Sequence, residues 1–130
     1  MLLDGRFIEA TVFNTWCYGS VKPDCEFSIG AYNPEAFDCL REYPDKDLTI
    51  LPYYLVADDK IRLIRQLERE EHPHCYEIAR RFLADEEDFT EIETDNTITP
   101  LISNTWGDCY DNAEKIIQDV VKLTHLDHNM

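Results

Sequence analysis

"DDKIRLIRQLEREEHPHCYEIARRFLADEED", residues 58–88, decides the fold class, because its apolar residues recur at helical spacing. We expect a first helix from a cap at Asp58 to about Glu70, with three apolar side chains on one side: Ile61, Ile64 and Leu67. Pro73 suits the first position of a second helix, whose core-facing stripe has the spacing i, i+3, i+4 and i+7: Cys75, Ile78, Ala79 and Phe82. The middle of the chain is therefore predicted to be a pair of helices.

The residues before this helical pair have the composition of a small sheet. Residues 5–13 and 25–32 are rich in β-branched and aromatic side chains, and turn-forming residues separate them, which predicts a hairpin. An Asn-Pro pair at residues 33–34 suits the start of a short helix. Residues 47–56 predict a further strand, although Pro52 restricts it to a sheet edge or a bulge.

The residues after the helical pair predict one strand and one long helix. Residues 96–106 have strand composition interrupted by Pro100, and residues 107–124 form a helical pattern with one apolar face: Ala113, Ile116, Ile117, Val120 and Thr124. The whole order predicts an α+β fold with a small antiparallel sheet and short helix, a central helical pair, and a C-terminal strand and long helix. Three subdomains are expected, which can also pack as one compact domain: 1–56, 57–88 and 89–130.

Charge is distributed unevenly along the 130 residues, whose formal net charge is -15. Residues 1–56 hold nine acids and four bases, residues 57–81 hold six of each, and residues 82–130 hold twelve acids and two bases. Such an acidic protein is a poor direct ligand for nucleic acid or for an anionic membrane. Its charged partners are expected to be basic.

Cysteine spacing and the N-terminus bear on the compartment. Five cysteines occur without a C-x-x-C pair, which favours reduced, mostly buried thiols over a disulfide framework or a zinc site: Cys17, Cys25, Cys39, Cys75 and Cys109. No apolar run reaches 18 residues, and the first ten residues lack the pattern of a secretory signal. We expect a cytoplasmic protein.

Catalytic motifs are weak in this sequence. No G-x-S-x-G elbow or G-x-x-x-x-G-K-[ST] loop is present. His72 and His74 flank Pro73, and the adjacent His74 and Cys75 would point in different directions on a helix. We therefore expect no enzyme activity, no cofactor and no metal site.

The stretch "LADEEDFTEIETDN", residues 83–96, carries seven carboxylates and no Lys or Arg. The first four acids are expected to end the second helix, and the others alternate with Thr and Ile as in a strand, about 6.6 Å apart. This spacing resembles a row of phosphates that a basic groove could neutralise. With two acids near the start of the last helix, the predicted partner-binding residues are Asp85, Glu86, Glu87, Asp88, Glu91, Glu93, Asp95, Asp108 and Asp111.

Two segments resemble the antirestriction proteins of the ArdA type: "FIEATVFNTWCYG" (residues 7–19) and "SNTWGDCYDNAEKII" (residues 103–117). The order of a small β-rich unit, a helical middle and an acidic segment is similar to that family as well. In the second segment the resemblance depends on five residues: Asp108, Tyr110, Asp111, Ala113 and Ile117.

The resemblance implies a phage or plasmid protein that mimics the shape and charge of DNA. Such a protein occupies the DNA-binding groove of a type I restriction-modification enzyme, and a CRISPR nuclease complex is an alternative target. The resemblance also implies a homodimer, although residues 49–56 lack the His-Asp pair often found in the family, and much of its last domain is expected to be missing. Asp108 and Asp111 are the acids that match the family.

Two other functions stay open on the sequence. An immunity protein would neutralise one nuclease toxin through a similar acidic face. A small metalloenzyme would use His72, His74 and a cysteine. The non-catalytic inhibitor is the leading expectation.

Overall fold

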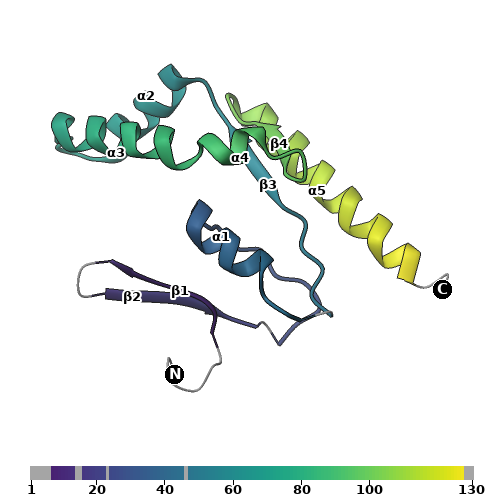
Figure 1. Cartoon of the computed structure of the whole chain (residues 1–130). Coiled ribbons are helices and arrows are strands. Elements are labelled where there is room, and N and C mark those ends of the chain that lie inside the picture. The colour runs from purple at the N-terminus through teal and green to yellow at the C-terminus, as the bar shows by residue number, and fades with distance from the viewer. Residues whose placement is uncertain (1–6, 14–15, 23, 46, 128–130) are drawn as a thin grey trace. The chain divides into compact units, whose positions relative to one another are not determined.

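The fold is α+β and consists of two compact units, Met1–Ile50 and Leu51–Met130, in a computed structural model (Figure 1). The structure describes residues 7–13, 16–22, 24–45 and 47–127. Each unit has its own two-stranded sheet. The boundary falls after Ile50, before the strand at residues 53–56. That strand was expected in the first subdomain, but it pairs with a strand of the second unit.

The first unit begins with an antiparallel hairpin of β1 (Phe7–Phe13) and β2 (Trp16–Val21). Phe13 and Trp16 are register partners, so only two residues connect the strands. The predicted second strand, residues 25–32, is wrong: this segment is neither helix nor strand. The nearer segment pairs instead, because a two-residue loop closes a hairpin at a lower entropic cost than a longer one.

Helix α1 (Pro34–Arg41) confirms the predicted short helix. The Asn33 side chain caps it by accepting a hydrogen bond from the backbone N–H of Ala36 at 2.9 Å. Ala36 and Leu40 are one turn apart and buried, and α1 packs against β1, where Ile8 is buried too. These three side chains form the apolar core of the first unit within the described residues.

The second unit contains six elements in chain order: β3 (Tyr53–Val56), α2 (Asp59–Arg69), α3 (Cys75–Asp88), α4 (Thr90–Thr94), β4 (Thr99–Ile102) and α5 (Trp106–Asp127). β3 and β4 pair in parallel, and the helices between them provide the crossover that parallel strands require. The strand expected over residues 47–56 is therefore shorter and starts after Pro52.

Pro100 lies inside β4 and does not interrupt it. The backbone N–H of Thr99 donates to Pro52 and that of Ser103 to Val56, so these odd-numbered residues face β3. Pro100 then faces the open edge, where its missing N–H costs no ladder hydrogen bond.

The central helical pair is confirmed, with differences in its detail. α3 begins at Cys75 and not at Pro73, because the His74 ring caps it: Nδ1 accepts a hydrogen bond from the backbone N–H of Glu77 at 3.3 Å. In the predicted stripe only Ile78 is buried, while Cys75 and Ala79 are exposed. No residue of α2 is buried, and Ile64 and Leu67 are about two-fifths exposed at 38% and 39%.

Helix α5 confirms the predicted long helix but is rotated relative to the predicted apolar face. Ala113 and Ile117 are exposed. Two hydrogen bonds fix the rotation: Asn112 Nδ2 donates to the backbone oxygen of Ile102 at 2.7 Å, and Tyr53 Oη donates to Asp119 at 2.9 Å. Burial and this bond raise the pKa of Tyr53 to about 12.

The expectation of buried cysteines is wrong for the four whose side chains are described. All four are exposed free thiols: Cys25, Cys39, Cys75 and Cys109. Cys17 lies outside the residues whose side chains are described. Among the described helices, none combines the length and apolar character needed to cross a membrane.

The register partners Leu101 and Leu55 provide a test of where the core of the second unit lies. Leu101 is 3% exposed and Leu55 is 62% exposed. Leu101→Ala should lower the free energy of unfolding by about 3 kcal/mol, because it leaves a cavity. Leu55→Ala should change it by less than about 0.5 kcal/mol. Urea unfolding followed by far-UV circular dichroism measures both; equal effects would contradict this core.

Candidate partner-binding surface

The acidic stretch follows a nearly continuous helical path from α3 into α4. Phe89 joins the helices with αR backbone angles of φ −90° and ψ 0°. Its N–H donates to the Asp85 oxygen at 3.0 Å, and its own oxygen accepts from the N–H of Glu93 at 3.1 Å. The predicted strand over Glu91 to Asp95 is therefore wrong, and the 6.6 Å spacing of an extended chain does not apply.

Side chains around Phe89 explain why this segment is helical. The Phe89 ring stacks on Tyr54 of β3, with centroids 5.5 Å apart and planes 20° apart. Thr90 Oγ1 donates to the backbone oxygen of Glu86 at 2.9 Å, and Thr94 Oγ1 donates to that of Glu91 at 3.0 Å. These threonines satisfy helical carbonyl groups where the alternating pattern suggested a strand.

Three of the predicted acids have partners inside the unit. Glu86 forms an ion pair and hydrogen bond with Arg62 of α2. Glu93 accepts a hydrogen bond from Tyr54 Oη at 3.3 Å. Asp95 accepts from the backbone N–H of Thr97 at 2.8 Å and from its hydroxyl at 2.6 Å, which closes a turn. These carboxylates stabilise the fold.

Three other acids form what we call the carboxylate strip: Glu87, Asp88 and Glu91. All three are exposed, and within the described part of the chain their side chains have no hydrogen bond or ion pair. Glu91 lies three residues after Asp88 and four after Glu87, so the helical path places it beside both, about 6 Å away. Asp85 also lacks a side-chain partner among these residues but is half-buried.

Asp108 and Asp111 lie on another element, the first turns of α5. Asp108 and Thr105 form a reciprocal cap: the Thr105 N–H donates to Asp108 Oδ2 at 2.7 Å, and the Asp108 N–H donates to Thr105 Oγ1 at 3.2 Å. The hydrogen bonds from the Thr105 and Asn104 backbone lower the pKa of Asp108. Asp108 is thus a structural cap, whereas Asp111 is exposed.

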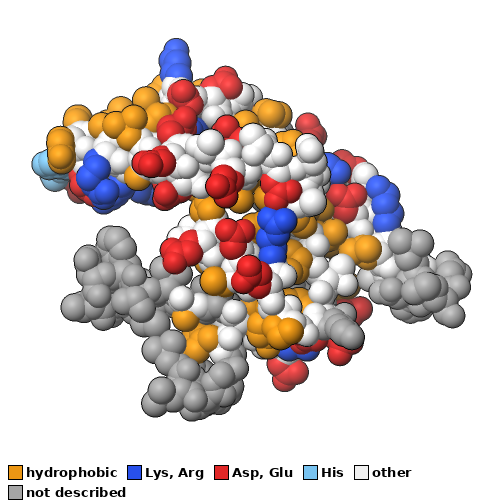
Figure 2. All heavy atoms as spheres, viewed as in Figure 1, with side chains coloured by type: hydrophobic (Ala, Val, Ile, Leu, Met, Phe, Trp, Pro, Cys, Tyr) orange, Lys and Arg blue, Asp and Glu red, His pale blue; other side chains and the backbone are white. Residues whose placement is uncertain are grey.

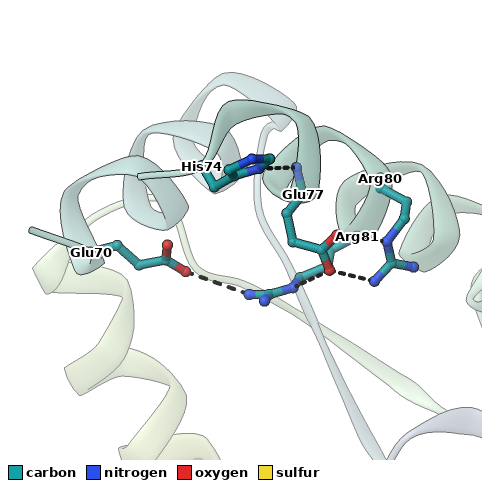
Figure 3. Close-up of polar contacts among 5 residues, drawn as sticks. All are labelled: Glu70, His74, Glu77, Arg80 and Arg81. Atoms are coloured by element: carbon teal, nitrogen blue, oxygen red, sulfur yellow. Dashed lines mark hydrogen bonds and ion pairs between the residues drawn. The ribbon is translucent and has the colours of Figure 1, made fainter. Parts of the chain in front are cut away.

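The cations nearest the strip in sequence are already engaged. Figure 3 shows the Glu77 carboxylate bound by Arg80 at 2.6 Å and by Arg81 at 3.3 Å, and Arg81 also reaches Glu70 at 3.5 Å. These arginines, Arg80 first, lower the pKa of Glu77 to about 2. On α2, Arg65 donates to two backbone oxygens of the loop before α5, at 2.7 and 3.2 Å.

The position of the acids opposes the dipole of α3. Its last turn contains Asp85 to Asp88 and no basic residue. Negative charge near a helix C-terminus is unfavourable by a few tenths of a kcal/mol to about 1 kcal/mol per group at low salt. The N-terminus of α4, which follows at once, offsets part of this cost.

Figure 2 shows carboxylates, in red, spread over the face in view with fewer Lys and Arg side chains, in blue.

Two local motifs could have separated structural acids from the others. Thr105 and Asp108 have the spacing of a capping box, and Asp95 lies two residues before Thr97, as in an Asx turn. The Arg62–Glu86 ion pair has no such signal, because 24 residues separate its partners.

Among the described residues, no group of three or more His, Cys, Asp or Glu side chains is placed to hold a metal ion.

Comparisons with known proteins return no match for this chain, whether to family models, to curated proteins or to solved structures.

The Glu77 carboxylate should titrate far below its ordinary value of 4.5. Because its pKa is lowered in the folded protein, the stabilisation it gives is present above pH 4.5 and is lost as the pH falls from 4.5 towards 2. Carboxyl-carbon NMR should give a midpoint of about 2. Arg80→Gln should raise this midpoint, whereas Arg69→Gln on α2 should leave it unchanged. A wild-type midpoint near 4.5 would show that these arginines are not held by Glu77.

Proposed function

We propose that the protein is a non-catalytic inhibitor that presents an acidic, DNA-like surface to the basic DNA-binding groove of a host defence complex. The observation that carries this proposal is the carboxylate strip, whose three acids have no partner within the described part of the chain. The excess of acids over bases after residue 81 supports it. The proposed place of action is the bacterial cytoplasm, where such complexes operate.

Repulsion among the acids of the carboxylate strip favours its binding to a basic groove. Two unit charges about 6 Å apart repel each other by about 0.7 kcal/mol in water and by about 2.8 kcal/mol at an effective permittivity of 20. A groove lined with Lys and Arg would replace that repulsion with attraction and release counterions from both surfaces. Binding of this kind weakens steeply as salt increases.

The choice of target follows from the resemblance of residues 7–19 and 103–117 to ArdA-type antirestriction proteins. A type I restriction-modification enzyme is accordingly the first target, and a DNA-cleaving CRISPR complex is the second. Asp108, which matches that family, is assigned to the α5 cap, so its loss should act through stability. The three acids of the carboxylate strip are the ones we assign to the basic groove of the partner.

An immunity protein for a nuclease toxin is the second candidate. The observation that favours it is the small extent of the strip, because Glu86, Glu93 and Asp95 are held by partners inside the unit. A compact acidic patch suits the active-site cleft of one nuclease, whereas a longer row of charges suits a DNA-binding groove.

Competition with DNA tests the proposal. The full chain should displace a fluorescent duplex from a type I restriction-modification enzyme or from a CRISPR nuclease complex, as measured by anisotropy. The triple variant Glu87→Lys, Asp88→Lys and Glu91→Lys should raise the half-inhibitory concentration at least about tenfold, because it places cations against a basic groove. Circular dichroism should show that the variant keeps its helices, since all three residues are exposed.

A matched triple variant distinguishes the strip from net charge. Glu26→Lys, Asp38→Lys and Glu68→Lys reverse three exposed acids elsewhere and change the net charge by the same amount. This variant should inhibit almost as well as the wild type. Equal loss in both variants would refute a role for the strip. Failure to displace DNA from either complex, with inhibition of a nuclease toxin, would favour the immunity protein.

A further inference from the structure

Helix α5 has an exposed apolar face, which we call the α5 stripe: Trp106, Tyr110, Ala113, Ile117 and Val121. These residues are spaced i, i+4, i+7, i+11 and i+15, so they follow one side of the helix. Four of them are among the exposed large apolar side chains of the unit: Trp106 at 83%, Tyr110 at 77%, Ile117 at 62% and Val121 at 44%. The stripe extends over most of the 22-residue helix, which Figure 1 shows as the last element.

The α5 stripe is distinct from the side of the helix that packs on the unit. Ile116 and Val120 are half-buried, and the neighbouring Asn112 and Asp119 make the hydrogen bonds to Ile102 and Tyr53. Helix α5 therefore has more apolar side chains than the second unit buries. Fully buried aromatic side chains each remove 150–250 Å² from water, so Trp106 and the tyrosine next to it on the stripe expose roughly 300 Å². The largest apolar patch on a soluble protein is commonly a few hundred Å² and is often functional.

Charges beside the stripe indicate what kind of partner would fit. Asp111 and Glu114 lie three residues apart along one edge. Asp111 has no side-chain partner among the described residues, and Glu114 accepts only a hydrogen bond from Gln118 at 3.3 Å. The free charge along this edge is negative.

The lysines of α5 do not balance that edge. Lys115 and Lys122 both reach Asp119, at 3.1 and 3.4 Å, on the other side of the helix. These contacts lower the pKa of Asp119, the hydrogen bond from Lys115 being the largest cause. Lys115 lies four residues after Asp111, but its ion pair, like that of Lys122, is with Asp119.

A second copy of the chain is a poor occupant for this surface. A parallel pairing of two α5 stripes would bring Asp111 and Glu114 of one copy towards the same acids of the other. Each copy also has a formal net charge of -15. An amphipathic helix with Lys or Arg beside its apolar face would cover the stripe and neutralise the edge in one contact.

We propose that the α5 stripe is a docking face for a basic amphipathic helix of a partner protein. This surface lies on a different element from the carboxylate strip. The proposal therefore holds whether or not the strip blocks a DNA-binding complex. Binding would place the large apolar anchors Trp106, Tyr110 and Ile117 against the apolar side of the partner helix.

Tryptophan fluorescence of the full chain tests this proposal. Trp16→Phe leaves Trp106 as the single tryptophan reporter. The probe is a synthetic peptide of about three heptads with Leu at the a and d positions and Lys or Arg at the flanking positions. The control is the same peptide with Glu in place of Lys and Arg. The basic peptide should shift Trp106 emission to the blue in a saturable way that weakens with salt, and the acidic peptide should not.

Variants of the stripe show whether the peptide binds there. Tyr110→Ser with Ile117→Ser should weaken binding about tenfold or more, as expected for lost apolar anchors. Leu83→Ser removes an equally exposed apolar side chain from α3, at 67%, and should leave binding unchanged. No blue shift with the basic peptide, an equal response to the acidic peptide, or equal loss in both variants would overturn the proposal.

Light scattering on the free protein tests the other occupants. A monomer with water-exposed Trp106 emission is expected. A dimer at micromolar concentration with blue-shifted emission would assign the stripe to a second copy and overturn the proposal. A monomer with blue-shifted emission would show that another part of the same chain covers the stripe, which overturns it as well.

Discussion

The shortage of cations is the constraint on which the arrangement of the second unit depends. Residues 57–81 carry equal numbers of acids and bases, and several of these arginines bind close to their own position. Arg80 and Arg81 hold Glu77, and among the described cations Arg62 is the one that pairs with the acidic stretch, at Glu86. Among the described residues, no cation pairs with the three acids of the carboxylate strip, so water, salt or another molecule can screen them.

Contacts of aromatic rings add to the small apolar core of the same unit. Its buried apolar residues, among those described, are Ile78, Ile98 and Leu101. The Arg62 guanidinium lies 4.4 Å from the centre of the Phe82 ring, and Tyr54 stacks on Phe89. These contacts fix α2, α3 and β3 relative to one another with little buried surface. Much apolar surface consequently stays exposed, above all on α5, and is available to a partner.

Sequence patterns predicted elements whose signals are local. The helical pair, α1 and α5 follow from periodicity, and their bounds lie close to the expectation. The expected cap at Asp58 is wrong, because its side chain makes no cap hydrogen bond to α2. The predicted partner of the first strand, residues 25–32, was wrong, because residues 16–21 also have strand composition. The segment nearer in sequence pairs with the first strand. The strand predicted over residues 90–94 was wrong, because alternating Thr and Glu fit a strand and a helix alike. The stacking of Phe89 on Tyr54, which fixes this segment, is a tertiary contact that the sequence pattern does not show. For the same reason, charge alone could not separate paired Glu86 from the carboxylate strip.

The salt dependence of binding shows whether the carboxylate strip contacts a cationic cleft. Calorimetry of the full chain against the complex it displaces from DNA, at several salt concentrations, gives the slope of log Kd against log salt. Glu87→Gln, Asp88→Asn and Glu91→Gln remove three charges with little change of shape. The slope for this neutral variant should be smaller than that of the wild type, because three ion contacts with the cationic cleft are lost. A slope equal to that of the wild type would contradict the account.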